Sequence, residues 1–368
     1  MFAIILASLA SGCGKPESKW VQSLTFGQLS ADVRCVEFTH DSERLITGGD
    51  DSLIRIWDVN SGHLEALLGA HSGPVLSVAM SPDDDLFASA GEDKTVRIWR
   101  LSESKEQRLL KYRGGDLGVW HVAYAADGRH IAAMGGGCAQ IWSTDENSLE
   151  TFLLGETNER DSAAAFSQDG SRIVTVGGGA VRLWKTETGV REREMALKGA
   201  WQSDEGACAQ CAYSPDGKYV AICINRSLMI VDASIDDVRK EWVSDDKVIV
   251  GACWSKDSET VAVATLDGPA WAIPVSDRSQ LRRLAFRDAR DSLLSVEFSP
   301  DGKFIAGDGW WDCNIFDAER GERIQPRGAK GKRKYVNTHR YPFARFSKDG
   351  RYLVDTSNPL VLWKRSGR

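Results

Sequence analysis

Few side chains in this 368-residue chain have the type and spacing that chemistry requires. Cys208 and Cys211 are separated by two residues, which is the spacing of zinc-binding and redox-active cysteine pairs. The pair stands alone in the sequence and falls on an expected strand, where residues three apart face opposite sides, so we interpret it as structural. The motifs His-Glu-x-x-His and Gly-x-Ser-x-Gly do not occur, and the glycine runs precede strands and not helices. We therefore predict no catalytic residue, no metal site and no cofactor.

One cysteine near the start of the sequence has a different context. Residues 2–10 form an apolar run that is too short to span a bilayer, and Ala10-Ser11-Gly12-Cys13 follows it. Small residues ahead of a cysteine resemble the lipobox of a bacterial lipoprotein signal peptide. The resemblance implies that the thiol of Cys13 receives a diacylglycerol, which would tether the protein to a membrane. No Lys or Arg precedes the apolar run, and a mis-assigned start or an ordinary buried strand is the alternative interpretation.

A repeated turn defines the elements that would position any site. Sequences of the type Ser-Pro-Asp-Gly occur eight times, and their aspartates are 42, 44, 42, 47, 41, 44 and 48 residues apart. These turn aspartates are Asp41, Asp83, Asp127, Asp169, Asp216, Asp257, Asp301 and Asp349. Alternating or apolar runs flank each turn, which predicts a hairpin, and a third strand and a more polar fourth strand follow. A four-stranded unit with this period is typical of a propeller blade.

Two of the units resemble WD40 repeats. Residues 49–58 read Gly-Asp-Asp-Ser-Leu-Ile-Arg-Ile-Trp-Asp, and residues 91–99 read Gly-Glu-Asp-Lys-Thr-Val-Arg-Ile-Trp. In that family a His, a Ser or Thr, an Asp and a Trp form a buried hydrogen-bonded tetrad. The resemblance assigns this structural tetrad to His71, Ser89, Asp93 and Trp99. The first repeat keeps a partial tetrad, which consists of Thr47, Asp51 and Trp57, and later repeats lose more of it, so we expect their blades to be packed by ordinary hydrophobic contacts.

The repeats predict an all-β chain that folds as a single β-propeller of eight four-stranded blades. Residues 1–19 would be a signal peptide and short linker, and residues 20–368 the propeller. The eighth unit ends after its third strand, at Trp363, while residues 20–26 form a strand without partners at the other end. Pairing the two would close the ring and remove its open edges. Seven blades is the alternative, if the sixth repeat is an insertion.

Two surfaces are candidates for binding. In WD40-like propellers, partners are expected at the narrow top face, where one side chain per blade points outward near the central channel. Aligning the repeats on the turn aspartate places Arg34, Leu76 and Trp120 there, and Trp and Arg dominate interface energies. The alternative is that Trp120 only caps a blade core. The second candidate is a basic stretch that contains Arg327, Lys330, Lys332, Arg333 and Lys334, which would meet an acidic protein, anionic lipid or a polyanion, unless it is a solvated loop.

These observations predict a non-catalytic platform that binds another protein and is anchored by lipid in the bacterial cell envelope. The net charge of −6 and the pI of about 5.7 give no reason to expect a specific nucleic-acid partner, and we expect a monomer. A cytoplasmic scaffold with a mis-assigned N-terminus is one alternative. A periplasmic propeller enzyme or small-molecule sensor is another: His or carboxylate groups converging on the central channel would favour it, and a channel lined by Gly, Ala and Val would exclude it.

Overall fold

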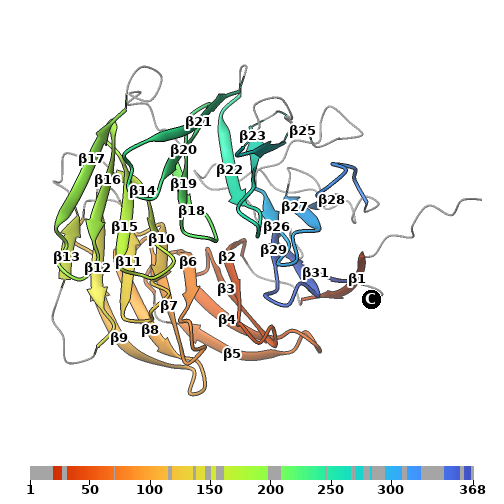
Figure 1. Ribbon diagram of the computed structural model, residues 1–368. Helices are drawn as coiled ribbons and strands as arrows, with labels where there is room; N and C mark the ends of the chain where they lie inside the picture. Colours follow the sequence, from red (N-terminus) through yellow and green to blue (C-terminus); the bar gives the residue numbers. More distant parts are fainter. Residues whose placement is uncertain are drawn as a thin grey trace, which may run out of the picture.

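The computed structural model describes residues 20–26, 31–69, 71–114, 118–135, 138–145, 151–154, 161–197, 209–244, 247–266, 268, 270–276, 282–283, 295–308, 313–324, 344–356 and 360–365. These residues form strands, turns and bends, and the strands build eight antiparallel sheets arranged in a ring (Figure 1). None of them belongs to a helix long and apolar enough to cross a membrane.

Each sheet is one blade, and in all but one of them the strands follow one another in chain order. Blade 1 contains β2 (Val33–Phe38), β3 (Arg44–Gly49), β4 (Leu53–Asp58) and β5 (Leu64–Gly69). Blade 2 contains β6 (Val75–Met80), β7 (Leu86–Gly91), β8 (Thr95–Arg100) and β9 (Lys105–Lys111). Blade 3 contains β10 (His121–Tyr124), β11 (His130–Met134), β12 (Ala139–Ser143) and β13 (Thr151–Leu154). Blade 4 contains β14 (Asp161–Phe166), β15 (Arg172–Gly177), β16 (Ala180–Lys185) and β17 (Arg191–Ala196).

The second half of the ring repeats this order. Blade 5 contains β18 (Ala209–Tyr213), β19 (Tyr219–Ile224), β20 (Ser227–Asp232) and β21 (Val238–Val243). Blade 6 contains β22 (Ile249–Trp254), β23 (Thr260–Thr265), β24 (Trp271–Pro274) and β25 (Arg282–Arg283). Blade 7 contains β26 (Glu297–Phe298), β27 (Phe304–Asp308) and β28 (Cys313–Asp317), and a single bridge between Phe316 and Arg323 stands beyond β28. The sixth repeat is therefore a genuine blade, and the seven-blade alternative is wrong.

Blade 8 combines both ends of the propeller. It contains β29 (Ala344–Phe346), β30 (Tyr352–Asp355), β31 (Val361–Arg365) and, as its outer strand, β1 (Trp20–Thr25). Trp20 pairs with Arg365 and Thr25 with Val361, and Figure 1 shows β1 beside β31. The predicted closure of the ring is confirmed.

The turn between the first and second strands has the same construction in all eight blades. The turn aspartate accepts a hydrogen bond from the backbone N–H two residues later, at 2.8–3.1 Å. In every blade except blade 3, a Ser or Thr two residues before the aspartate also donates its hydroxyl group to it, at 2.5–2.7 Å. The residue after the aspartate has φ between 59° and 72°. This left-handed conformation favours glycine, because it is strained for residues that have a Cβ atom.

The hydrophobic core lies between the blades. Eight clusters of buried apolar side chains occur among the described residues, and each draws its members from two neighbouring blades. One cluster joins blade 8 to blade 1 and another joins blade 7 to blade 8, where Trp20 is 1% exposed and contacts Phe304 and Phe346. Because every interface is filled, each blade is held by both of its neighbours.

Candidate interaction sites

The four tetrad residues of blade 2 form one hydrogen-bonded chain. His71 precedes β6, Ser89 lies on β7, Asp93 in the next turn and Trp99 on β8. The imidazole Nδ1 lies 3.0 Å from the Asp93 carboxylate, and Nε2 lies 2.7 Å from the Ser89 hydroxyl group. The indole N–H of Trp99 donates to the same hydroxyl group at 2.9 Å. All four side chains are nearly inaccessible, so each buried polar group has a partner in place of water.

Burial and hydrogen bonding set the protonation of this chain. Burial lowers the pKa of His71 below its ordinary value and outweighs the opposing effect of Asp93. Burial alone would raise the pKa of Asp93, but hydrogen bonds from Thr95, His71 and the backbone of Ser72 lower it. The arrangement therefore favours a neutral imidazole that donates from Nδ1 to an ionised carboxylate and accepts from Ser89.

Blade 1 satisfies its partial tetrad in a different way. The indole N–H of Trp57 donates to Thr47 at 3.0 Å, as Trp99 donates to Ser89 in blade 2. Asp51 accepts from the guanidinium group of Arg55, at 2.6 and 3.2 Å, in place of an imidazole. In blade 4, the indole N–H of Trp184 donates to Thr175 at 3.0 Å, so this blade keeps the same Trp–Thr pair.

The three residues predicted to bind a partner lie where the inner strands begin, on the side of the ring opposite the turns. Arg34 and Leu76 occupy irregularities of register, or bulges, in β2 and β6, and Trp120 immediately precedes β10. We call this the bulge side and the opposite side the turn side. The side chain of Arg34 is 12% exposed and makes two hydrogen bonds to Asp50, at 2.6 and 2.7 Å. Leu76 is half-buried.

Trp120 is half-buried and packs against a cluster shared by blades 3 and 4. It therefore contributes to the core, as the alternative interpretation has it, while part of its surface stays accessible. Cys13, Cys208 and the basic stretch of Arg327, Lys330, Lys332, Arg333 and Lys334 lie outside the described residues.

A charged cluster links three neighbouring inner strands. Arg345 of β29 lies 2.6 Å from Glu37 of β2 and 3.5 Å from Glu297 of β26, and Lys348 lies 3.1 Å from Glu37. Glu297 also accepts the backbone N–H of Phe346 at 2.8 Å. These contacts cross both interfaces of blade 8, the blade that closes the ring.

The three charged residues of the inner strands share one repeat position, four residues before the turn aspartate. The other five blades carry small side chains there, namely Ala79, Ala123, Ala165, Ala212 and Cys253. Burial would raise the pKa of Glu37, but Arg345 and Lys348 hold it below its ordinary value. Burial raises the pKa of Glu297, and Arg345 only partly offsets that effect. Two carboxylates thus converge here, and basic groups neutralise them.

Among the described residues, no group of three His, Cys, Asp or Glu side chains is placed to hold a metal ion.

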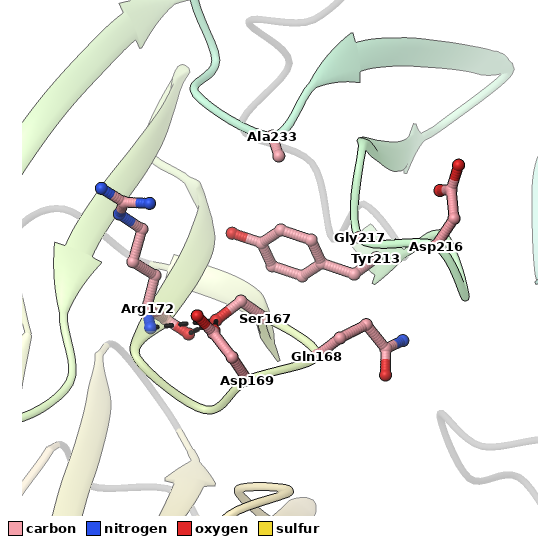
Figure 2. Close-up of a pocket in the computed structure, with 8 residues that line it drawn as sticks. All are labelled: Ser167, Gln168, Asp169, Arg172, Tyr213, Asp216, Gly217 and Ala233. Carbon is pink, nitrogen blue, oxygen red and sulfur yellow. Dashed lines mark hydrogen bonds between the residues drawn. The ribbon is translucent and has the colours of Figure 1, made fainter.

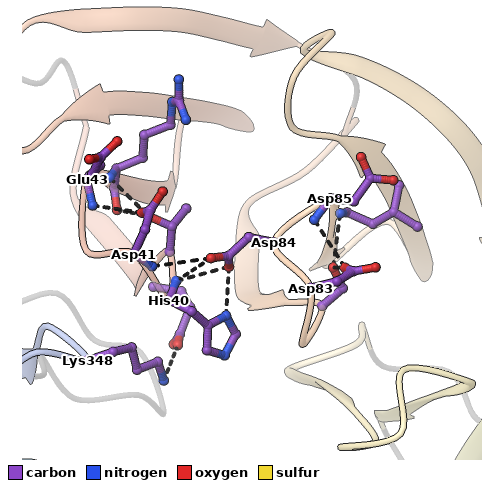
Figure 3. Close-up of polar contacts among 12 residues, drawn as sticks. His40, Asp41, Glu43, Asp83, Asp84, Asp85 and Lys348 are labelled. Carbon is purple, nitrogen blue, oxygen red and sulfur yellow. Dashed lines mark hydrogen bonds and ion pairs between the residues drawn. The ribbon is translucent and has the colours of Figure 1, made fainter.

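On the turn side, side chains of some turns bind the neighbouring turn. Figure 3 shows the carboxylate of Asp84 reaching from blade 2 to blade 1, where it accepts from the backbone N–H groups of His40 and Asp41. The hydroxyl group of Ser258 accepts from the backbone of Asp216 at 3.0 Å, and that of Ser42 from the backbone of Asp349 at 3.3 Å. These three are the turns that have no glycine after the aspartate. Their side chains offset the cost of the left-handed conformation by joining the blades.

A pocket of about 260 Å³ lies between the turns of blades 4 and 5. Figure 2 shows its lining, which consists of Ser167, Gln168, Asp169, Arg172, Tyr213, Asp216, Gly217 and Ala233. Hydrogen bonds from Ser167 and Ser171 lower the pKa of Asp169 to about 2. Tyr213 is 7% exposed, and its hydroxyl group has no hydrogen-bond partner among the described residues.

Neither the charged cluster nor the pocket is among the sites predicted from the sequence. The charged cluster was detectable, because reading all eight repeats four residues before the turn aspartate shows Glu, Glu and Arg among small residues. The pocket was not, since it depends on how far apart two turns stand and on one small side chain, Ala233.

Comparison with known proteins agrees with this architecture. The family model "WD domain, G-beta repeat" matches residues 19–58 and 62–100, which cover β1, blade 1 and the first three strands of blade 2. The DENN domain and WD repeat-containing protein SCD1 of Arabidopsis thaliana is 41% identical over 64 residues, which are 17% of this chain and 4% of that protein. The β-propeller domain of Cps50 (Swd1) from Myceliophteria thermophila has a TM-score of 0.63 at 15% identity, over 79% of this chain and 96% of that domain. Residues 19–58 and 62–100 are thus similar to WD40 repeats, and the chain folds as a β-propeller.

Proposed function

We propose that this protein is a non-catalytic platform that binds another protein and is held by a lipid on Cys13 in the bacterial cell envelope. The observation that carries the platform is the closed ring, in which β1 pairs with β31 and every blade shares a core with both neighbours. Side chains at one repeat position are then held on rigid strands, which reduces the entropy lost on binding. On the bulge side, Leu76 and the accessible part of Trp120 are available for such contacts.

The proposed anchor rests on the sequence Ala10-Ser11-Gly12-Cys13. Seven residue steps separate Cys13 from Trp20, and a chain of that length spans at most about 25 Å. Trp20 pairs with Arg365, whose side chain binds the turn aspartate Asp301 of blade 7. A lipid on Cys13 would therefore keep the turn side of blade 8 close to the bilayer and leave the bulge side accessible.

The anchor is tested by the intact mass of the protein from membrane and soluble fractions of its host. We expect a diacylated chain that begins at Cys13 in the membrane fraction, and its loss in a Cys13→Ser variant. Unmodified full-length protein in the soluble fraction alone would contradict the anchor.

The platform is tested separately, with a photo-crosslinking amino acid in place of Leu76. We expect one protein to be captured reproducibly from this position and not from position 109, where Leu109 is exposed on the outer strand β9. Equal capture from both positions would contradict a specific interface on the bulge side.

A further inference from the structure

We propose that the pocket between blades 4 and 5 receives the guanidinium group of an arginine side chain from a protein partner. The proposal rests on the proposed function as a protein-binding platform and gives the chemistry of one contact on the turn side. Three features of the described residues support it: a matching contact elsewhere in the ring, a permanently ionised carboxylate, and a buried hydroxyl group that lacks a partner.

The matching contact lies between blades 7 and 8. Arg365 extends from the end of β31 toward blade 7, where its guanidinium group lies 2.8 Å from the carboxylate of Asp301 and 4.6 Å from the centre of the Phe304 ring. Asp301 is the turn aspartate of blade 7, as Asp169 is that of blade 4. The fold thus already contains an arginine bound to a turn aspartate at a junction between two blades.

Ala233 leaves the same place open between blades 4 and 5. The backbone N–H of Arg365 bonds to the carbonyl of Arg351, two residues after the turn aspartate of its own blade. The N–H of Ala233 makes the equivalent bond to Lys218 in blade 5. A methyl group therefore stands where the arginine side chain stands in blade 8, and the pocket has the position that a guanidinium group fills there.

The charges of the pocket favour a cation. Asp169 stays ionised throughout the physiological range, since hydrogen bonds from Ser167 and Ser171 hold its pKa at about 2. Arg172, which stands in the place of Phe304, is the basic group of the lining, and Glu192 offsets its charge at 2.6 Å. Asp216, on the far wall, is paired with Lys218 at 3.0 Å. Among the described residues Asp169 forms no ion pair, although the charge of Arg172 acts on it.

Tyr213 adds a hydrogen-bonding group to the pocket wall. Its hydroxyl group is buried without a partner, which is unfavourable for a polar group. Burial raises the pKa of this phenol, so it stays neutral and its oxygen can accept a hydrogen bond. In Figure 2 the ring extends between Asp169 and Ala233. A guanidinium group, with five N–H donors, can bond to Asp169 and, once the side chains that cover the hydroxyl oxygen move aside, to Tyr213 as well.

The first experiment measures binding of N-acetyl-arginine methylamide to the full chain by saturation-transfer NMR. We expect a saturable signal for this probe and none for N-acetyl-citrulline methylamide, which has nearly the same shape without the charge. Binding of citrulline at equal strength would overturn the proposal. Free L-arginine serves as a further arm: if it binds and the blocked form does not, the site takes an amino acid and not a protein side chain.

Substitutions then place the probe in this pocket. Ala233→Arg and the uncharged Ala233→Leu fill the space, and we expect both to abolish the signal while the thermal midpoint stays at or above that of the wild type. Tyr213→Phe removes one hydrogen bond to a charged group, so we expect about tenfold weaker binding without loss of stability.

Tyr124→Phe is the matched control. Tyr124 occupies the same repeat position in blade 3, and its hydroxyl group is likewise buried without a partner, but it does not line this pocket. Unchanged binding in Tyr213→Phe, or a retained signal in folded Ala233→Leu, would overturn the proposal. The crosslinking test at position 76 can be repeated in the Ala233→Arg variant. If the same protein is still captured, the proposed function as a binding platform is supported, and that capture does not depend on this pocket.

Discussion

Buried polar side chains are satisfied by different partners in different blades. In blade 2 an imidazole, a carboxylate and a hydroxyl group form one chain that ends at Trp99. In blade 1 the guanidinium group of Arg55 stands in for the imidazole, so the aspartate keeps a partner although the histidine is absent. A repeat can therefore lose one member of the tetrad without leaving a buried charge unpaired.

His71→Gln tests the protonation of this chain. The folded pKa of His71 lies below its ordinary value, so the unfolded chain binds the proton more readily, and this contribution to stability is lost as pH falls below about 6.5. We expect His71→Gln to cost about 1–3 kcal/mol at pH 7.5 and less at pH 5.5. Hydrogen exchange of β7 and β8 at both pH values measures this, with His63→Gln, at an exposed position, as the control. Parallel pH profiles for wild type and variant would contradict it.

The charged cluster at blade 8 gives a second prediction. Glu37→Gln leaves Arg345 and Lys348 without their shared carboxylate, and we expect it to lower the free energy of unfolding by about 1–3 kcal/mol at pH 7. Because the folded pKa of Glu37 is lowered, the deficit should shrink as pH falls below about 4.5. Urea unfolding of both single variants and of the double variant with Arg345→Met measures the coupling. Additive effects would show that the pair does not couple blades 8 and 1.

At the scale of elements, the turns balance backbone strain against bonds between blades. Ser258 has φ of 62° and accepts the backbone N–H of Asp216. Ser258→Ala loses the bond and keeps the strain, whereas Ser258→Gly loses the bond and relieves the strain. We therefore expect alanine to be less stable than glycine by about 1 kcal/mol in thermal or urea unfolding.

Gly302→Ala isolates the strain in this comparison. Gly302 has φ of 72°, and a Cβ atom there would meet nothing within 4 Å. The loss of stability caused by Gly302→Ala should therefore match the difference in stability between Ser258→Ala and Ser258→Gly. A much smaller cost would show that strain in the left-handed conformation does not explain the difference between the two Ser258 variants.

Most elements of the fold were predictable from local pattern. The turn sequence fixes the start of every second strand, and alternation of apolar residues fixes the strands beside it. Blade 7 was less predictable, because two residues of β26 and a single bridge beyond β28 are too short to leave a period in the sequence. The contacts of Arg34 were also out of reach, since Asp50 approaches it only when β2 and β3 pair.

At the scale of the molecule, ring closure should control stability. Trp20 is fully buried between blades 7 and 8, so Trp20→Ala should cost about 3–5 kcal/mol. A chain that begins at Ala31 would also leave the edge of β31 unpaired, and we expect it to self-associate. Light scattering and thermal unfolding measure both effects, with a chain that begins at Lys19 as the control. A monomeric chain of unchanged stability would contradict a role for β1 in closure.

The number of blades and the closing strand were predictable because they follow from counting turns and strands. The pocket between blades 4 and 5 was not, because its shape depends on the spacing of two neighbouring blades. The ring is therefore well predicted from the sequence, because it is set by repetition. The binding surface is poorly predicted, because its sites arise where the repeats differ from one another.

The pairing of β1 with β31 also has a consequence during synthesis. The two paired strands are among the first and the last described residues to leave the ribosome, with more than 300 residues between them. At bacterial or eukaryotic elongation rates, Trp20 waits on the order of tens of seconds before its partner strand exists. Until then the early blades carry an unfinished interface, which a chaperone or a translocation channel could hold open, so the timing of closure is decided by the last strand to be made.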